Sequence, residues 1–268
     1  MLFNKTLFKR TRRTLQKGAL YFSKTIARKG VKAKKALLTR EIEASLNYRI
    51  AYGPLRGTLL SAEGRWGRRD RSSMFFGLYE KEVLDHLTLL ASRERVLIDI
   101  GAGDGYYAVG CLRAGLFGKT VAFETSELGR QIIHTTAGLN NVSHQIEIHG
   151  EAKLEILKNI ASAIQQPPVI LIDIEGAEFD LVTDAFLELF RLCSIIIEIH
   201  DEIVSDGHQL YASLLGRCNH LFSVREIRTG PRDPSRFSEL ERLSDDERWL
   251  ICSEGRRQLG KWIFLEPL

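Results

Sequence analysis

Two stretches of the chain begin with the same four residues and decide the fold: LIDIGAGDG at residues 97–105 and LIDIEGAEFD at residues 171–180. Each is an apolar run that reaches an aspartate, Asp99 in the first and Asp173 in the second. Short apolar runs of this kind are typical of parallel strands that are buried on both faces. Glycines follow the first run and carboxylates follow the second. We therefore expect two strands of one sheet whose ends have different roles.

Strands and helices alternate around these two stretches. The pattern predicts strands over residues 96–100, 119–124, 144–150, 167–176 and 194–201. It predicts helices over residues 75–94, 126–141, 153–164 and 177–190. Short strands separated by such helices indicate an α/β protein with a doubly wound, mostly parallel sheet. The ligand of such a sheet lies beyond the carboxyl ends of its strands, so the residues that end each strand are the candidate site.

The end of the first strand has the features of a nucleoside site. Gly101, Gly103 and Gly105 allow a tight turn and a close approach of the backbone to a ligand. Asp99 precedes them, where a ligand ammonium or a turn amide needs an acceptor. Glu124 ends the next strand, twenty-one residues after Gly103, and an acid there can accept both hydroxyls of a ribose. A dinucleotide brings phosphates that Asp99 would repel, so we expect a cationic nucleoside, S-adenosylmethionine. The alternative is that both acids only cap helices.

The fourth and fifth predicted strands end in carboxylates and one histidine: Asp173, Glu175, Glu198, His200 and Asp201. Neighbouring carboxylates raise each other's pKa and can form a base poised near neutrality. His200 is the natural proton acceptor from a substrate hydroxyl among them. A hard metal cation is an alternative ligand for such a cluster, although we predict no metal site. Glu178 is expected to be only a favourable charge at the start of a helix.

Together these motifs resemble the FkbM family of class I S-adenosylmethionine-dependent methyltransferases. The resemblance is carried by LIDIGAGDGYYAVG (97–110), VAFE (121–124), LIDIEGAEFDLV (171–182) and IIIEIHD (195–201). GLYEKEVLDHL (77–87), SEGR (253–256) and WIFLEP (262–267) are similar as well, so the resemblance covers residues 75–268. It implies a Rossmann-like sheet of seven strands, in which residues 220–227 and 261–267 form the last, antiparallel pair.

The resemblance also implies roles for single residues. The cofactor-binding set would be Asp99, Gly101, Ala102, Gly103 and Asp104 near the methionine portion, Glu124 at the ribose, Glu151 at the adenine edge and Asp173 near the methyl group. The catalytic set would be Asp173, Glu175 and His200, and residues 248–258 would bring Glu254, Arg256 and Arg257 to the substrate side. Family members mostly methylate hydroxyl groups of sugars, lipids or polyketide-type metabolites. A small-molecule or glycan acceptor, methylated at oxygen with general-base assistance, is therefore expected.

The N-terminal part of the chain differs in composition from the rest. Residues 1–40 contain thirteen Lys/Arg and no Asp or Glu, whereas the remainder holds 25 basic and 34 acidic residues. At about 100° per residue, the apolar residues of this segment fall in one arc: Phe8, Leu15, Ala19, Phe22, Ile26, Ala33 and Leu37. We expect a basic amphipathic helical extension over residues 1–45 and a methyltransferase domain over residues 46–268. The extension suits an anionic membrane surface first, then packing or homodimerisation, and nucleic acid least.

Composition places the chain in the cytoplasm, peripheral on the inner face of a membrane. The four cysteines are scattered and form no C-x-x-C pair, and no stretch approaches the roughly 18 apolar residues of a membrane span. The basic leader also resembles a mitochondrial presequence. Two other function classes stay open: an RNA methyltransferase that holds nucleic acid through the leader, and a non-catalytic, membrane-associated cofactor-binding protein. The net acidic remainder counts against the RNA reading.

Overall fold

The predicted strands pair into one seven-stranded sheet in the order β3-β2-β1-β4-β5-β7-β6. The computed structural model describes residues 26–64, 70–256 and 258–268. Its strands are β1 (Ser92–Ile100), β2 (Phe117–Phe123), β3 (Ile146–His149), β4 (Val169–Ile172), β5 (Ser194–Glu198), β6 (Phe222–Arg228) and β7 (Lys261–Pro267). β1 to β5 are parallel, and β7 runs antiparallel between β5 and β6. This confirms the predicted doubly wound, mostly parallel sheet with an antiparallel last pair.

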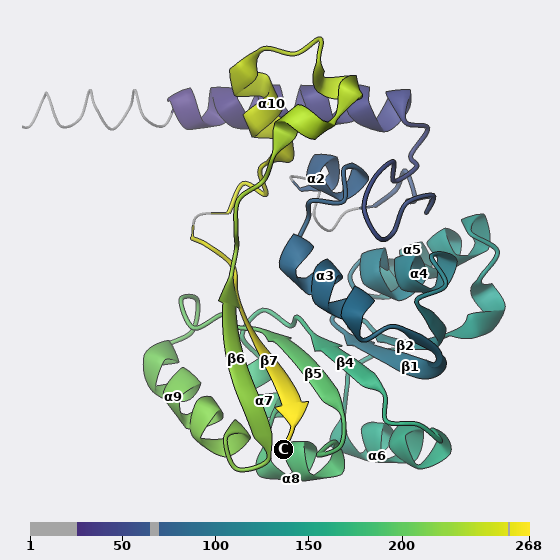
Figure 1. The fold of residues 1–268 in the computed structure, drawn as a ribbon, viewed down its shortest axis with the longest axis vertical. Helices are drawn as coiled ribbons and strands as arrows, with labels where there is room; N and C mark the ends of the chain where they lie inside the picture. Colours follow the sequence, from purple (N-terminus) through teal and green to yellow (C-terminus); the bar gives the residue numbers. More distant parts are fainter. Residues whose placement is uncertain (1–25, 65–69, 257) are drawn as a thin grey trace, which may run out of the picture.

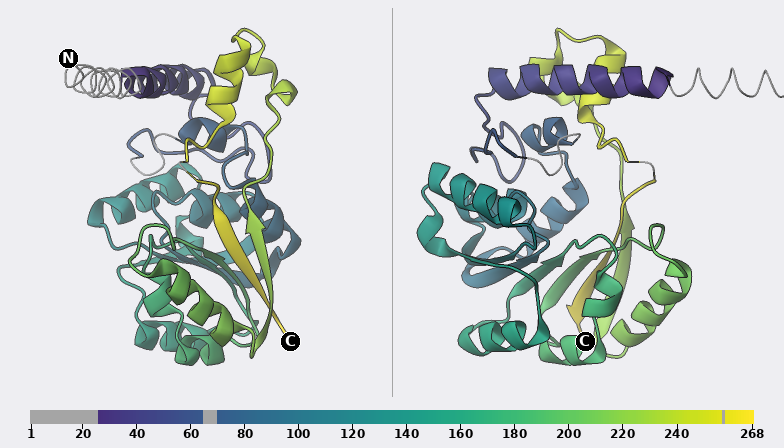
Figure 2. Two further views of the ribbon diagram at one scale, coloured as in Figure 1. Left: turned by 90° about the vertical axis from the view of Figure 1, so that its left-hand side faces the viewer. Right: turned by 180° about the vertical axis from the view of Figure 1, so that it is seen from behind.

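Helices cover both faces of the sheet (Figures 1 and 2). A helix over residues 26–45, here the N-terminal helix, begins the described chain. The other helices are α2 (Arg71–Phe75), α3 (Lys81–Leu89), α4 (Tyr106–Arg113), α5 (Glu127–Leu139), α6 (Leu154–Ala163), α7 (Glu178–Leu181), α8 (Asp184–Leu189), α9 (Gly207–Cys218) and α10 (Asp245–Cys252), with 3₁₀ turns η1 (Ser143–Gln145), η2 (Pro234–Arg236) and η3 (Ser238–Leu240). None of the described helices is long and apolar enough to cross a membrane.

The two stretches that begin with LIDI are neighbours in the sheet, because β1 and β4 pair directly. Their register places Asp99 beside Leu171 and Ile100 beside Ile172, so the repeat is offset by two residues along the ladder. Successive strand residues face opposite sides of a sheet. Leu97 and Leu171 therefore pack into the core on the side of α3 and α4, whereas Ile100 packs into the core on the side of α6, α8 and α9. Both faces are buried, as the apolar runs predicted.

The N-terminal helix packs on the body of the protein through one face. Its Leu38 and Ile42 are 9% and 1% exposed and belong to the core that also contains residues of α2, α3 and the sheet. The apolar arc that the sequence shows is not the face that packs, since Ile26 and Leu37 are 57% and 60% exposed. The expected leader before residue 26 lies outside the described residues.

Two predicted helices differ in the structure: the first is shortened to α3, with residues 92–94 in β1, and the second is broken into α7 and α8. In place of a helix over residues 75–94, α2 ends at Phe75, Gly77 adopts a left-handed φ of +62°, and α3 begins only at Lys81. A Cβ on Gly77 would come 2.8 Å from the Gly53 Cα, so this turn is packed against another loop. In place of a helix over residues 177–190, α7 ends at Leu181 and the Thr183 side chain caps the N-terminus of α8. Caps and breaks of this kind override helical periodicity because they satisfy free backbone groups.

Candidate functional site

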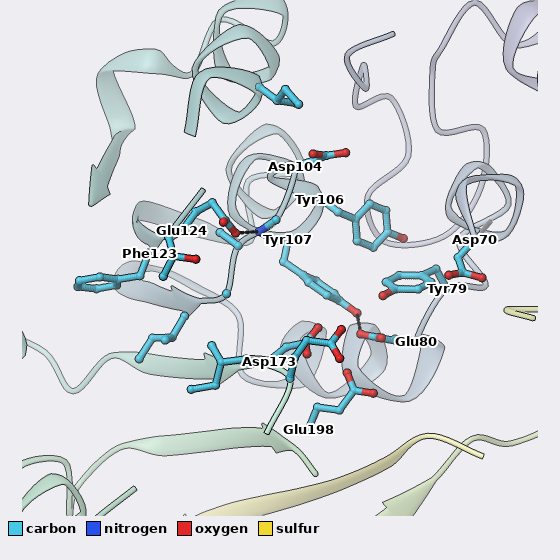
Figure 3. A pocket seen from close by; sticks show the side chains of 18 of the residues that line it. Asp70, Tyr79, Glu80, Asp104, Tyr106, Tyr107, Phe123, Glu124, Asp173 and Glu198 are labelled. Atoms are coloured by element: carbon cyan, nitrogen blue, oxygen red, sulfur yellow. Dashed lines mark hydrogen bonds between the residues drawn. The ribbon is translucent and has the colours of Figure 1, made fainter. Parts of the chain in front are cut away.

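A cavity of about 1070 Å³ lies at the carboxyl ends of the strands, where the chain connections diverge between β1 and β4. Figure 3 shows side chains from both halves of the sheet turned toward it. The cavity is lined by every residue of the predicted cofactor-binding and catalytic sets except Asp99: Gly101, Ala102, Gly103, Asp104, Glu124, Glu151, Asp173, Glu175 and His200. The fold therefore brings the glycine-rich turn and the acidic cluster into one space.

Glu124 ties the end of β2 to the glycine-rich turn. Its carboxylate accepts hydrogen bonds from the Gly103 N–H at 3.0 Å and the Ser126 N–H at 2.7 Å (Figure 3). Each carboxylate oxygen keeps a lone pair for a ligand hydroxyl. Gly129 in α5 makes room for it, because a Cβ there would lie 2.7 Å from the Glu124 Cγ. Sequence reasoning missed Gly129, since a glycine inside a helix pattern gives no sign of which side chain packs against it.

Asp99 lies beneath the cavity rather than in its wall. It is 2% exposed, and its Oδ2 has no hydrogen-bond partner among the described residues. Burial raises its pKa to about 7, although a hydrogen bond from the Ala108 backbone opposes the rise. Ala108 is in the first turn of α4, so Asp99 faces the start of the helix that follows the glycines. Its place favours support of the turn over direct contact with a ligand.

His200 lies at the centre of the acidic half of the cavity. Its Nε2 is 3.7 Å from Asp173 Oδ1, 3.8 Å from Glu175 Oε2 and 3.9 Å from Glu198 Oε1. Burial lowers the pKa of His200, but its carboxylate neighbours, Glu178 first, outweigh burial and raise it to about 8. Burial, together with Glu198 and Glu80, raises the pKa of Asp173 well above its usual value. His200 and Asp173 therefore retain protons near neutral pH and can exchange one with a bound group.

Glu178 is more than a charge at a helix start, which corrects the sequence-based expectation. It is the first residue of α7, but it is fully buried. Its carboxylate accepts the Gly176 N–H at 2.8 Å and the His200 N–H at 2.7 Å, and His200 Nδ1 lies 3.4 Å away. Burial raises the pKa of Glu178, but these bonds with His200 outweigh it and the pKa falls. The ionised carboxylate therefore joins the ends of β4 and β5 through backbone hydrogen bonds and places a negative charge beside the imidazole.

Another buried carboxyl group of the site, Glu80, was not predicted from the sequence. It precedes α3 in a left-handed conformation at φ +43°, and the Tyr107 hydroxyl donates to it at 2.7 Å (Figure 3). Burial and Glu198 raise the pKa of Glu80 to about 8 against the opposing effect of Arg256. The resemblance quoted the segment around Glu80 without giving it a role, and Tyr107 lies within the first motif. A buried contact between two segments so far apart leaves no local signal in the sequence.

Arg256 provides the positive charge for this group of acids. Its guanidinium pairs with Glu80, with Glu198 at 2.5 Å and with Glu254 at 2.8 Å, and it lies over the Trp262 ring. Glu254 and Arg256 both line the cavity, as the resemblance implied. Arg257 lies outside the described residues. Arginine suits such a bridge because its planar guanidinium offers several donors at once.

The described residues include two groups that could hold a metal ion. Asp173, Glu175 and His200 form one, and Glu80, Asp173 and Glu198 form the other, each with donor atoms within 4.8 Å of one another. Arg256 already neutralises part of the second group. Hard cations favour such carboxylate-rich sets. That no metal is required stays a prediction.

The remaining predicted residue, Glu151, follows β3 at the rim of the cavity. Its side chain is exposed and lies 3.3 Å from Lys153. Next to the acids, the rings of Tyr79 and Tyr106 meet edge to face with centroids 5.5 Å apart, and both line the cavity. The Tyr106 hydroxyl is buried and has no hydrogen-bond partner among the described residues. The cavity thus has a glycine-and-acid end, an acid–histidine cluster and an aromatic wall.

No family model matches the chain, and no curated protein matches it. Among solved structures, the chain is similar to an O-methyltransferase from Bacillus cereus in complex with SAH, at 17% identity and a TM-score of 0.48, over 87% of this chain and 90% of the other. It is similar to the O-methyltransferase TomG from Streptomyces achromogenes in complex with SAM, at 13% identity and a TM-score of 0.45, over 77% and 92%. It is also similar to an rRNA methylase from Streptococcus thermophilus, at 13% identity and a TM-score of 0.45, over 69% and 93%.

Proposed function

We propose that this chain is an S-adenosylmethionine-dependent O-methyltransferase of the FkbM type. The observation that carries the proposal is the single cavity that joins Glu124 and the glycine-rich turn to the cluster of Asp173, Glu175 and His200. Its volume of about 1070 Å³ leaves room for a nucleoside cofactor and a second ligand, since single-ligand pockets span roughly 300–1,000 Å³. One half fits the cofactor, and the other half fits the acceptor.

The cofactor half would bind a nucleoside that carries a positive charge. Glu124 has lone pairs for the ribose hydroxyls, and Gly101 to Asp104 provide backbone beside it. Glu151 at the rim would meet the adenine edge. Asp173 would lie near the sulfonium, whose positive charge suits a cavity lined by so many carboxylates. A phosphate-bearing dinucleotide would be repelled by the same groups.

The reaction half would methylate a hydroxyl group. The acceptor oxygen attacks the methyl carbon, a C–O bond forms, and the S–CH₃ bond breaks with its electrons returning to sulfur. The hydroxyl proton passes to a deprotonated group of the cluster of Asp173, Glu175 and His200, in which the two carboxylates lie 3.7–3.8 Å from the His200 Nε2. Holding donor and acceptor in line would supply most of the rate enhancement.

The lining of the cavity favours a polyhydroxyl acceptor, such as a sugar, a glycolipid or a polysaccharide. Carboxylates accept hydrogen bonds from hydroxyl groups, and the Tyr79–Tyr106 wall offers a face for a ring. The alternative of an RNA acceptor is disfavoured because a polyphosphate backbone is held by basic side chains, and Arg256 is already committed to three glutamates.

Binding of S-adenosylmethionine tests the cofactor half without knowledge of the acceptor. We expect S-adenosylmethionine to raise the melting temperature of the wild-type protein, since a ligand at 100 times its Kd stabilises a fold by about 2.7 kcal/mol. Glu124→Ala should remove the shift, and we expect the same of Asp99→Ala. Glu127→Ala, three residues from Glu124 and exposed, is the matched control and should keep the shift. No shift with wild-type protein would refute the proposed function.

A further inference from the structure

The N-terminal helix has two faces with different surroundings. Its docked face consists of Lys35, Leu38, Thr39 and Ile42, all buried. Around this face, Lys35 Nζ donates to the Ser253 carbonyl at 2.5 Å, and Glu43 pairs with Arg71 at 2.5 Å. These contacts fix the rotation of the helix about its own axis, so the residues on its other side cannot turn inward.

The outward face carries Ile26, Ala33 and Leu37. At about 100° per residue these residues lie on the side opposite the docked face. Ile26 and Leu37 are 57% and 60% exposed, and Ala33 is exposed as well. Such exposed apolar residues in a row are a mark of an interaction site rather than of a solvated helix. In the sequence, the same arc continues through Phe8, Leu15, Ala19 and Phe22.

Basic side chains flank this outward face. Lys29 and Arg40 are exposed and lie within about 60° of its centre, whereas the exposed Arg28 and Lys32 lie farther round the helix. No Asp or Glu occurs before Glu41. Figures 1 and 2 show that the helix crosses one end of the long axis of the molecule, away from β1 to β5. The segment that carries α10 lies beside the helix at this end and projects past it (Figures 1 and 2), so a partner of the outward face approaches from the side opposite the docked face.

We propose that the outward face of the N-terminal helix binds the surface of an anionic membrane. A bilayer surface answers both features of the face, because apolar side chains enter the boundary between headgroups and acyl chains while each Lys or Arg gains about 1 kcal/mol near anionic lipid. A second copy of the chain would bring two positive stripes together. An RNA would pair with the basic residues but would leave Ile26 and Leu37 in water. The proposal concerns the helix alone and does not depend on methyl transfer.

The docked side of the same helix contacts a segment that lines the cavity. Lys35 bonds to Ser253, and the next residues, Glu254 and Arg256, belong to the acid–arginine group of the site. Asp70, which lies 3.9 Å from Lys35 Nζ, also lines the cavity. A protein held on the membrane through its outward face would therefore present the cavity at a fixed position relative to that surface, as an enzyme with a lipid-linked acceptor requires.

Flotation of the full-length chain with lipid vesicles tests the proposal. We expect it to float with phosphatidylcholine vesicles that contain phosphatidylglycerol and not with phosphatidylcholine alone. The variant Ile26→Glu/Leu37→Glu should bind at least tenfold more weakly, and Lys29→Gln/Arg40→Gln should also lose binding. The control Leu139→Glu/Leu192→Glu makes the same chemical change at positions 47% and 63% exposed and should bind like the wild type. All substituted side chains are exposed, so melting curves should match.

Three results would overturn the membrane proposal. Vesicle binding that Ile26→Glu/Leu37→Glu retains as fully as the control Leu139→Glu/Leu192→Glu would show that the outward face is not used. Binding of single-stranded RNA that depends on Lys29 and Arg40 but not on Ile26 and Leu37, without vesicle binding, would assign the face to nucleic acid. A dimer in light scattering that Ile26→Glu/Leu37→Glu dissociates, again without vesicle binding, would assign it to a second copy.

Discussion

At the scale of single residues, Asp99 and Glu124 show how far two acids of similar sequence context can differ. Both were expected to meet the cofactor, and both are nearly buried at the ends of adjacent strands. Glu124 faces the cavity with two backbone hydrogen bonds, whereas Asp99 lies under the turn with an unpartnered oxygen. An unpartnered buried carboxylate is costly to ionise. Ionisation of Asp99 therefore lowers the free energy of unfolding.

Replacing Asp99 with asparagine tests this cost. A folded pKa raised from 3.8 to about 7 means that the folded protein holds an extra proton between these values, so stability falls as pH rises through about 7. Asp99→Asn should abolish this loss, which amounts to about 4 kcal/mol over the full window. Denaturant unfolding of both proteins at pH 5 and pH 8 measures the part of this loss above pH 5, about 2.7 kcal/mol. The exposed Asp246→Asn is the control and should follow the wild type. Parallel pH profiles for Asp99→Asn and wild type would contradict the assignment.

The residues that sequence reasoning found and those it missed differ in one physical respect. Asp173, Glu175 and His200 follow strands directly, so the rule that strand ends converge places them together. Glu80 comes before α3 and reaches the site only because its backbone takes a left-handed conformation and Arg256 arrives from the other end of the chain. Glu178 was placed correctly at a helix start, but its contact with His200 depends on how β4 and β5 pair.

At the scale of elements, the close contact between the ends of β1 and β4 accounts for the residue that follows β1. Gly101 follows β1 with φ +93°, and a Cβ there would lie 1.7 Å from the Asp173 carbonyl oxygen. The glycine is therefore required by the neighbouring strand, in addition to any approach of a cofactor. The sequence predicted the glycine-rich turn and placed both strands in one sheet. It could not predict this close contact, because the offset of two residues between β1 and β4 is set by packing on both faces of the sheet.

Gly101→Ala should therefore destabilise the protein by several kcal/mol, since backbone atoms cannot move aside as a flexible side chain can. Gly150→Ala is the matched control, because Gly150 also follows a strand of this sheet edge but has nothing within 4 Å of a Cβ. Gly150→Ala should change stability by less than about 1 kcal/mol. Denaturation midpoints of the two variants give the comparison. A Gly101→Ala protein as stable as the wild type would show that β1 and β4 are not apposed in this way.

At the scale of the whole molecule, the N-terminal helix shows the largest difference between the face that the sequence pattern indicates and the face that packs on the protein. The charge asymmetry and the apolar arc predicted a basic amphipathic helix, and residues 26–45 are helical. The residues that dock it, however, include Lys35 and Thr39, which no hydrophobic pattern selects. Lys35 is buried because Ser253 and Asp70 receive its ammonium group, and that arrangement depends on segments more than 30 and 200 residues away. Periodicity identified the free face and missed the bound one.

The place at which the chain is shortened should therefore decide its stability. Removal of residues 1–25 keeps every contact described for the N-terminal helix, whereas removal of residues 1–45 takes away Leu38 and Ile42, each worth about 1.5–3 kcal/mol when buried. It also leaves the buried Arg71 without Glu43. We expect the 26–268 protein to melt close to the full-length chain and the 46–268 protein to melt well below it or to aggregate. Equal melting temperatures for the two shortened proteins would mean that the helix is not part of the folded core. If the two melting temperatures were equal, the 46–268 protein would keep its fold and could serve as a further control for vesicle binding.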